Sequence, residues 1–316
     1  MRQLAVCYTA TSGYLFSTVL SALQARLHSD PASVSVLVCL IADHPSEEQD
    51  VFESVCERNG IDFIVVPLST LRGLHPAFAR LFLDEILPSE VQEVLYLDGD
   101  TQVLADLTPL LEAAPPAGGV LAVRDPMVFI RQVSPSLRGK IDGWWDESGI
   151  LPALRSNYVN SGVMRLSRAV LPELRDSVLD LIGGQGFSLH FKDQDAINIV
   201  LGPRIQPISL AWNFPGFLVG SNLVSVVSPR VVHFMSDPRP WEGPLPPWGA
   251  KYHEPYLAFV RQYPATAPYQ SRLHGTRRVR YELQQRYKGL AEGRLWRRKA
   301  AAEAVRALEQ ATLDLG

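Results

Sequence analysis

The stretch Leu95-Tyr96-Leu97-Asp98-Gly99-Asp100-Thr101-Gln102 is the most informative part of the sequence, because an apolar run ends there in two carboxylates separated by one glycine. Alternate side chains of a strand lie on the same face, so Asp98 and Asp100 can point into one pocket. Two such carboxylates repel each other unless a cation lies between them, and Mg²⁺ or Mn²⁺ usually binds phosphate as well as protein. The segment predicts a metal site for a phosphorylated substrate, although an Asp-Gly pair can also be a simple turn.

The segments on either side of this motif alternate between strand-like and helix-like patterns. Apolar runs predict strands at 4–9, 34–42, 62–66 and 94–97, with helices between them at 14–27, 45–58 and 76–86. Nearly continuous apolar strands between helices indicate an α/β fold with a mostly parallel sheet covered on both faces. Ligands of such sheets bind beyond the carboxyl ends of the strands, which is where Asp98 and Asp100 lie.

The second half of the chain has a weaker pattern. Strands are expected at 118–123, 158–166 and 230–234, and helices at 169–182 and 192–201. Residues 124–156 show no clear period, so we expect a long irregular loop there that acts as a lid or binding loop.

Charge is unevenly distributed along the chain. The 316 residues carry a formal net charge of −3, which does not suggest a protein that binds nucleic acid. Residues 271–316 contain 11 Lys and Arg and 5 Asp and Glu, which gives +6 and leaves −9 for the rest. We therefore divide the chain into a domain at 1–270 and a basic helical tail at 271–316. A basic amphipathic helix can lie on an anionic membrane surface, or it can pack on its own domain or on a second copy of the chain. The sequence leaves peripheral membrane contact and self-association both open.

Cysteine usage and hydropathy indicate a cytoplasmic protein. Cys7, Cys39 and Cys56 have no metal-ligand or disulfide spacing, so we expect buried, reduced thiols. The sequence has no run of about 18 uncharged apolar residues that would span a membrane.

Six segments together identify a family resemblance. They are Leu4–Tyr14, Ala79-Arg80-Leu81, Val94–Thr101, Tyr158–Met164, Asp193-Gln194-Asp195 with Asn198, and His233-Phe234 with Pro240-Trp241. In type and order they resemble the motifs of the retaining glycosyltransferases of family 8, which include bacterial lipopolysaccharide galactosyl- and glucosyltransferases and glycogenin. The resemblance runs from Gln3 to about Trp241. It implies a GT-A type, Rossmann-like fold and transfer of a hexose, glucose or galactose, from a UDP-sugar to a glycan or glycolipid.

The resemblance also implies a metal site and a diphosphate site. Asp98, Asp100 and His233 match the family's metal ligands, and an imidazole nitrogen favours Mn²⁺ over Mg²⁺. Arg239 stands where the family usually has a lysine that contacts the diphosphate, and arginine keeps that charge. Arg80 would contact the donor sugar or a metal-binding carboxylate, with a structural ion pair as the alternative.

A sugar-binding set is implied as well. Its members are Asp125, Asn160, Ser161, Asp193 and Gln194, whose carboxylate, amide and hydroxyl groups suit sugar hydroxyls. Among them Gln194, Asp193 and Asp125 are the expected catalytic residues. A glutamine amide is a weak nucleophile, so we favour same-face attack by the acceptor hydroxyl while the leaving phosphate takes its proton.

Two helix residues of the Asp-Gln-Asp motif have a less definite role. Asp195 and Asn198 lie one turn apart, and either could be a helix cap or a surface polar group, which is the better interpretation for Asn198.

The first strand departs from the family pattern. Thr11-Ser12-Gly13 replaces the usual acidic and amide residues that hold uridine and ribose, although hydroxyls such as that of Thr11 can still bind a nucleoside. Tyr8 or Tyr14 could stack on the base, and either could equally be a core residue.

Two other functions fit parts of the sequence. An aspartyl-phosphate phosphatase would use Asp98 as the nucleophile and Asp100 as the general acid, but its motif usually opens the chain. An inactive nucleotide-sugar-binding protein would explain the altered first turn.

Overall fold

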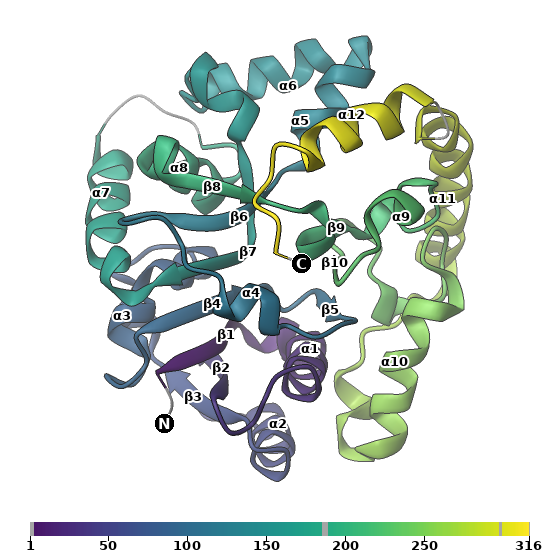
Figure 1. Cartoon of the computed structure of the whole chain (residues 1–316). Coiled ribbons are helices and arrows are strands. Elements are labelled where there is room, and N and C mark those ends of the chain that lie inside the picture. Colours follow the sequence, from purple (N-terminus) through teal and green to yellow (C-terminus); the bar gives the residue numbers. More distant parts are fainter. Residues whose placement is uncertain (1–2, 185–188, 297–298, 316) are drawn as a thin grey trace.

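A seven-stranded sheet forms the centre of the molecule (Figure 1). The computed structural model describes residues 3–184, 189–296 and 299–315. The strand order is β3-β2-β1-β4-β7-β6-β8. The strands span Leu4–Ala10 (β1), Val34–Ile41 (β2), Asp62–Val66 (β3), Glu93–Leu97 (β4), Val120–Arg124 (β6), Val159–Ser167 (β7) and Ile205–Ile208 (β8). Only β7 runs antiparallel to its neighbours, so the sheet is mostly parallel, as the sequence predicts.

Helices cover both faces of this sheet, which explains why strands at its centre such as β1 and β2 are almost entirely apolar. On one face, alternate residues such as Val6 and Val38 share an apolar cluster with α1 (Leu15–Leu27) and α2 (Glu47–Arg58), and α10 (Gly249–Gln262) packs on the outside of α1. The other face packs against a 3-10 helix at Pro76–Phe82, α3 (Leu83–Ile86), α7 (Leu171–Gly183) and α8 (Lys192–Leu201). All eight residues of β2 are buried, because a strand in this position has no solvent face.

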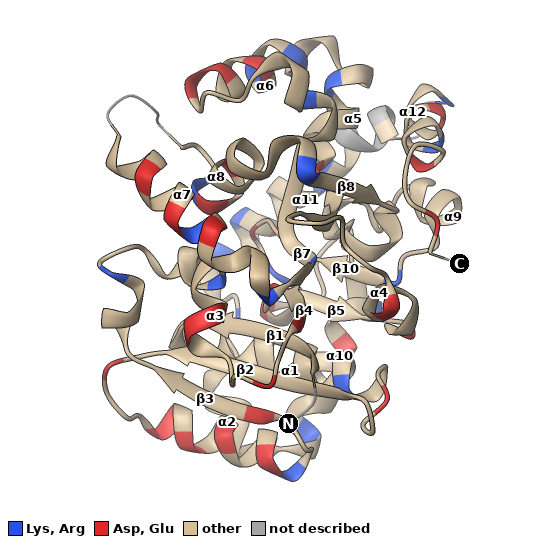
Figure 2. Ribbon diagram, turned by 60° about the vertical axis from the view of Figure 1, so that its left-hand side comes forward, with Lys and Arg blue, Asp and Glu red and all other residues tan. Residues whose placement is uncertain are grey.

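The start of α2 illustrates how local sequence sets an element. The Ser46 side chain accepts a hydrogen bond from the Gln49 amide, and Glu47, Glu48 and Asp50 lie in the first turn, where the helix dipole favours negative charge. Figure 2 shows acidic residues along this helix, in agreement with the acidic character of the body of the chain.

A second, three-stranded sheet contains Thr101 and Gln102, the last two residues of the Leu95–Gln102 segment. Its order is β5-β10-β9, with β5 at Thr101–Val103, β9 at Phe214–Pro215 and β10 at Val231–His233. The antiparallel pairing of β10 with β5 places His233 opposite Thr101. A bond from the Phe234 amide to the Asp100 carbonyl, 2.9 Å long, continues that pairing. The small sheet therefore brings His233 beside the two carboxylates.

The prediction of a long irregular loop at 124–156 is wrong. Two helices occupy it, α5 (Pro126–Val133) and α6 (Pro135–Glu147). Each starts with a proline in its first turn, and Asp125 caps α5 by accepting a bond from the Met127 amide. In α6 only Ile141 and Trp145 are buried, so its apolar period is too sparse to recognise.

Several other elements were not predicted either. They are β5, β8, β9, α4 (Thr108–Glu112), α9 (Leu223–Val227) and α10. The strands are two to four residues long, which is too short for alternation to register, and α10 contains Pro255, which obscures its helical pattern.

The basic segment at the end of the chain forms α11 (Gly275–Trp296) and α12 (Lys299–Glu309). Trp296, Ala301 and Val305 are buried in the same apolar cluster as one face of the sheet. The Leu313 amide donates to the Pro207 carbonyl beside β8. Trp296 and residues 299–313 are thus part of the main body, whereas much of α11 faces outward. No helix among the described residues is both long and apolar enough to cross a membrane.

Candidate active site

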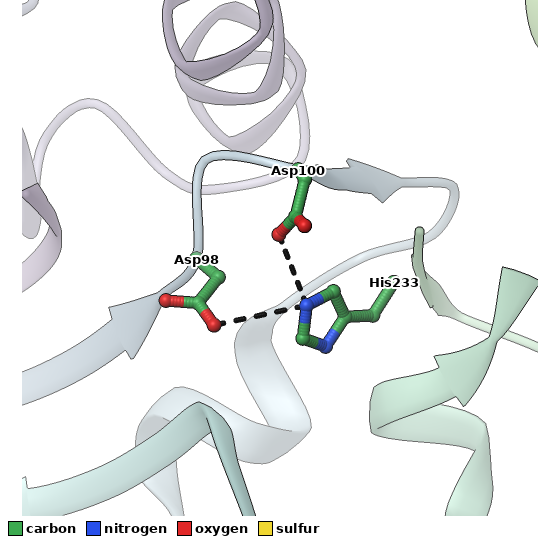
Figure 3. A group of neighbouring side chains, drawn as sticks. All are labelled: Asp98, Asp100 and His233. Atoms are coloured by element: carbon green, nitrogen blue, oxygen red, sulfur yellow. Dashed lines mark ion pairs between the residues drawn. The ribbon is translucent and has the colours of Figure 1, made fainter. Parts of the chain in front are cut away.

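Asp98, Asp100 and His233 form a cluster whose polar atoms converge on one point (Figure 3). Asp98 follows β4, Asp100 precedes β5, and His233 ends β10. The His233 Nε2 atom lies 3.0 Å from Asp100 Oδ1 and 3.7 Å from Asp98 Oδ2. One potential ligand atom from each residue lies within 4.8 Å of the other two. The fold thus brings together the three residues that the sequence suggests as metal ligands.

The turn between the two carboxylates is held from several sides. The Asp98 amide donates to the Gly162 carbonyl at 2.8 Å, and the Thr101 hydroxyl donates to the Asp98 carbonyl at 2.8 Å. At Gly99 a Cβ atom would lie 1.9 Å from the Thr18 Oγ1 atom of α1, so the turn has no room for a side chain there. Rigid support of this kind pre-orients the two acidic side chains.

Two arginines balance the negative charge. Arg80 lies 2.8 Å from Asp98 and 3.1 Å from Asp193, and Arg239 lies 2.6 Å from Asp100. Burial opposes ionisation of Asp100, but His233 and Arg239 outweigh it and hold the pKa of this carboxyl well below its usual range. Burial likewise opposes the charge on Arg80, and Asp193 and Asp98 outweigh it, so the pKa of Arg80 is raised.

The cluster fits a divalent cation in the chemistry of its donors. Two carboxylates supply hard oxygen ligands, and Asp100 is held in its ionised form. Burial lowers the pKa of His233, but the facing Asp100 carboxylate outweighs this and raises it, so a cation would replace a proton at Nε2.

Asp98, Asp100 and His233 line a pocket of 560 Å³, and a second set of polar residues lines the same pocket. Asn160 donates to Asp125 at 3.2 Å and to Gln194 at 2.9 Å, and Gln194 donates to Asp125 at 3.1 Å. Ser161 donates to Asp193 at 3.0 Å. Burial raises the pKa of both Asp125 and Asp193. The predicted sugar-binding set is therefore one hydrogen-bonded cluster next to Asp98, Asp100 and His233.

Asp195 and Asn198 are buried within α8, so the expectation that Asn198 is a helix cap or a surface polar group is wrong. Asn198 bonds to both the amide and the carbonyl of Val159, each at 2.8 Å, and so ties α8 to β7. Asp195 accepts bonds from the hydroxyls of Tyr158 and Ser148 and from the Phe191 amide. The Tyr158 hydroxyl in turn accepts a bond from Gln194 at 3.0 Å. Together these bonds fix the start of α8.

We expect Tyr158→Phe to lower the free energy of unfolding by about 1–3 kcal/mol, because the change leaves the buried Oδ1 atom of Asp195 and one hydrogen of the Gln194 Nε2 group without a partner. Urea unfolding followed by circular dichroism measures the effect. Tyr263→Phe is the matched control, since the Tyr263 hydroxyl bonds to Asn59 and Gln262 in partly exposed surroundings. Equal losses in the two variants would contradict a special role for Tyr158.

A groove of 470 Å³ continues from the Asp98–Asp100–His233 cluster toward the first turn. Thr11, Tyr14, Arg80 and both metal-site carboxylates line it. Tyr14 is 44% exposed at its rim, so its ring is accessible to a flat ligand.

Tyr8 does not line this groove. Its ring is completely buried in the core, and its hydroxyl donates to the Ser21 carbonyl and accepts from the Ser21 hydroxyl. Burial raises the pKa of this phenol. Of the two roles stated for Tyr8, the core role is the one that its position supports.

Sequence reasoning missed Asn213, which contacts His233 and Asn160 at 3.0 Å and 2.8 Å. Its only signal in the sequence is an amide within the apolar run Leu210–Leu218.

Comparisons with known proteins agree with this arrangement. Residues 5–243 match the model of Glycosyl transferase family 8. No curated protein matches the sequence. Among solved structures, the WbbM bifunctional glycosyltransferase in its apo form has a TM-score of 0.66 and 16% identity, over 85% of this chain and 51% of that chain. This chain therefore spans about half the length of WbbM.

Two further structures show the same fold. The galactosyltransferase LgtC, in complex with donor and acceptor sugar analogs, has a TM-score of 0.62 and 18% identity, over 82% of this chain and all of LgtC. The apo form of GlyE from Streptococcus pneumoniae TIGR4 has a TM-score of 0.59 and 17% identity, over 86% and 65% of the two chains. The fold is thus the expected GT-A type, and because the family match covers well over half of the sequence, the chain belongs to glycosyltransferase family 8.

Proposed function

We propose that this protein transfers a hexose, glucose or galactose, from a UDP-sugar to a glycan or glycolipid acceptor, with retention of the anomeric configuration and with Mn²⁺ or Mg²⁺ as the cofactor. The observation that carries the proposal is that the Asp98–Asp100–His233 cluster and the polar set around Gln194 share one pocket. A nucleotide groove lined by Thr11 and Tyr14 adjoins them. A metal-bound diphosphate would then place its sugar among the buried amides and carboxylates.

The residues around the cluster have separable tasks in this reaction. A bound cation stabilises the charge that develops on the leaving diphosphate. Arg239 lies beside Asp100 and can contact the diphosphate through its remaining guanidinium donors. Asp125, Asn160, Asp193 and Gln194 orient the sugar hydroxyls. Gln194 is held by Asp125 and Asn160, which suits positioning rather than covalent catalysis, so we favour same-face attack by the acceptor.

The direct test is turnover of UDP-glucose and UDP-galactose by the full chain with Mn²⁺, Mg²⁺ or excess chelator. Release of UDP from the donor, even to water, measures bond cleavage without a known acceptor, and NMR of the sugar product reports its anomeric configuration. We expect metal-dependent cleavage with retention. Tight donor binding without any cleavage would instead support an inactive nucleotide-sugar-binding protein.

We also propose that α11 contacts an anionic membrane, which would suit a glycolipid acceptor. Val279, Leu283, Tyr287 and Leu290 recur at spacings of four, four and three, so they lie on one face of the helix. These four side chains are 56–74% exposed. Arginines at 280 and 286 adjoin this apolar stripe, and such flanking cations bind anionic headgroups.

Replacing Leu283 and Tyr287 by Gln should weaken binding to vesicles of phosphatidylglycerol and phosphatidylcholine by about tenfold, because each side chain loses part of its apolar burial in the lipid. Vesicle co-sedimentation measures this binding. Leu27→Gln with Leu151→Gln is the control, since these leucines are 80% and 65% exposed outside α11. If the α11 variant binds vesicles normally but loses a dimer seen by gel filtration, the stripe serves self-association instead.

A further inference from the structure

One buried amide connects the metal cluster to the sugar-binding set. Asn213 ends a 3-10 helix at Leu210–Asn213 and is 1% exposed. Its Oδ1 atom lies 3.0 Å from the His233 Nδ1 atom, and its Nδ2 atom donates to Asn160 Oδ1 at 2.8 Å. Its hydrogen bonds go to His233 and Asn160, so it stands behind the proposed metal ligand rather than in the ligand set.

The surrounding bonds fix which way this amide points. Asn160 Oδ1 also accepts a bond from the Gly162 amide at 3.0 Å, while Asn160 Nδ2 donates to Asp125 and Gln194. The atom of Asn213 that faces Asn160 Oδ1 must therefore be its NH₂ group. Its oxygen is left to face His233, so the His233 Nδ1 atom carries the hydrogen and donates it.

This orientation has a consequence for the opposite ring nitrogen. A neutral imidazole with its hydrogen on Nδ1 has a lone pair on Nε2, and that atom faces Asp98 and Asp100. Outer partners of this kind set the tautomer of metal-binding histidines and typically change metal affinity about 10- to 100-fold. The NH₂ end of the same amide holds Asn160 in the orientation that serves Asp125 and Gln194.

We propose that Asn213 is a positioning residue that couples the two halves of the site: its oxygen presents His233 to a divalent cation, and its NH₂ group orients Asn160 toward the donor sugar. The inference rests on the proposed function, because it gives Asn213 a role in both metal and sugar recognition. The two ends of one amide act on different ligands, so their contributions can be separated by substitution.

Asn213→Asp separates them, because a carboxylate still accepts the His233 Nδ1 hydrogen but cannot donate to Asn160. We expect Mn²⁺ binding in the presence of UDP, measured by electron paramagnetic resonance, to stay within about threefold of the wild type. The ratio of the affinity for UDP-galactose or UDP-glucose to the affinity for UDP, measured by calorimetry, should fall about tenfold. Asn213→Leu removes both bonds and should weaken Mn²⁺ binding about tenfold or more as well.

Asn222→Asp is the matched control, since Asn222 is exposed and makes no cap hydrogen bond through its side chain. We expect this variant to behave as the wild type in every assay. Equal losses of metal and sugar binding in Asn213→Asp and Asn213→Leu would overturn the proposal, as would wild-type behaviour of both.

The ring tautomer of His233 provides a readout that does not depend on ligand binding. Nitrogen-15 NMR above the titration range of this histidine should show the hydrogen on Nδ1 in the wild type and a mixture of tautomers in Asn213→Leu. An Nε2–H tautomer in the wild type would overturn the proposal directly. Absence of both Mn²⁺ and UDP-sugar binding by the wild-type chain would instead refute the proposed function, and the tautomer would then decide the orienting role of Asn213 by itself.

Discussion

Gly162→Ala is expected to abolish metal-dependent activity. Gly162 lies in β7, directly behind the cluster, where an added Cβ atom would be 2.3 Å from the Cε1 atom and 2.6 Å from the Nδ1 atom of His233. The same atom would be 2.8 Å from the Asp98 Oδ2 atom. All three separations are well below van der Waals contact, so two of the three proposed metal ligands must move.

Neither of these two residues can move without losing an existing contact. His233 is 3% exposed and bonded to Asn213, and Asp98 is paired with Arg80. Loss of several kcal/mol of charge stabilisation by the cation corresponds to a rate about 1,000-fold lower. Donor cleavage and Mn²⁺ binding by electron paramagnetic resonance both measure the change.

Gly139→Ala is the matched control for this substitution. Gly139 lies in α6, and a Cβ atom there meets nothing within 4 Å. Alanine is the better residue in a helix, so this variant should be as active as the wild type and slightly more stable. Tight Mn²⁺ binding by Gly162→Ala would contradict the inferred location of the cation.

The sequence predicts the central sheet well because its strands are buried on both faces. Nearly every residue of β1 and β2 is apolar, so their extent can be read from composition alone. The Asp98–Asp100 pair is also predictable, because both carboxylates follow the apolar strand β4 at an edge where ligands bind.

Other parts of the site depend on contacts that no local pattern encodes. His233 reaches the carboxylates through β10, a strand of three residues, and the resemblance to a family, rather than any period, suggests this residue. Asn213 can be recognised as part of the site only from its two hydrogen bonds in the folded protein. Tyr8 and Tyr14 have the same side chain, and only the packing of α1 decides that the first is buried and the second exposed.

Asp100→Asn is the second variant with a large expected effect. One oxygen of Asp100 faces the His233 Nε2 atom at 3.0 Å, and the other accepts a bond from Arg239 at 2.6 Å. In asparagine the single oxygen can satisfy Arg239, which leaves the NH₂ group pointing at the place of the cation. The variant replaces a charged ligand by hydrogen-bond donors, so binding of UDP with Mn²⁺ should fall about 100-fold or more.

The control for this variant removes a charge next to the same arginine. Asp237 lies 3.1 Å from Arg239 and is 64% exposed, whereas Asp100 is 11% exposed. Asp237→Asn therefore makes the same chemical change with the same partner but outside the cluster, where an exposed ion pair contributes about 0–1 kcal/mol. Calorimetric titration of UDP and Mn²⁺ should separate the two variants clearly. Unchanged binding by Asp100→Asn would refute the metal site, and equal weakening in both variants would assign the effect to Arg239 instead of a ligand role for Asp100.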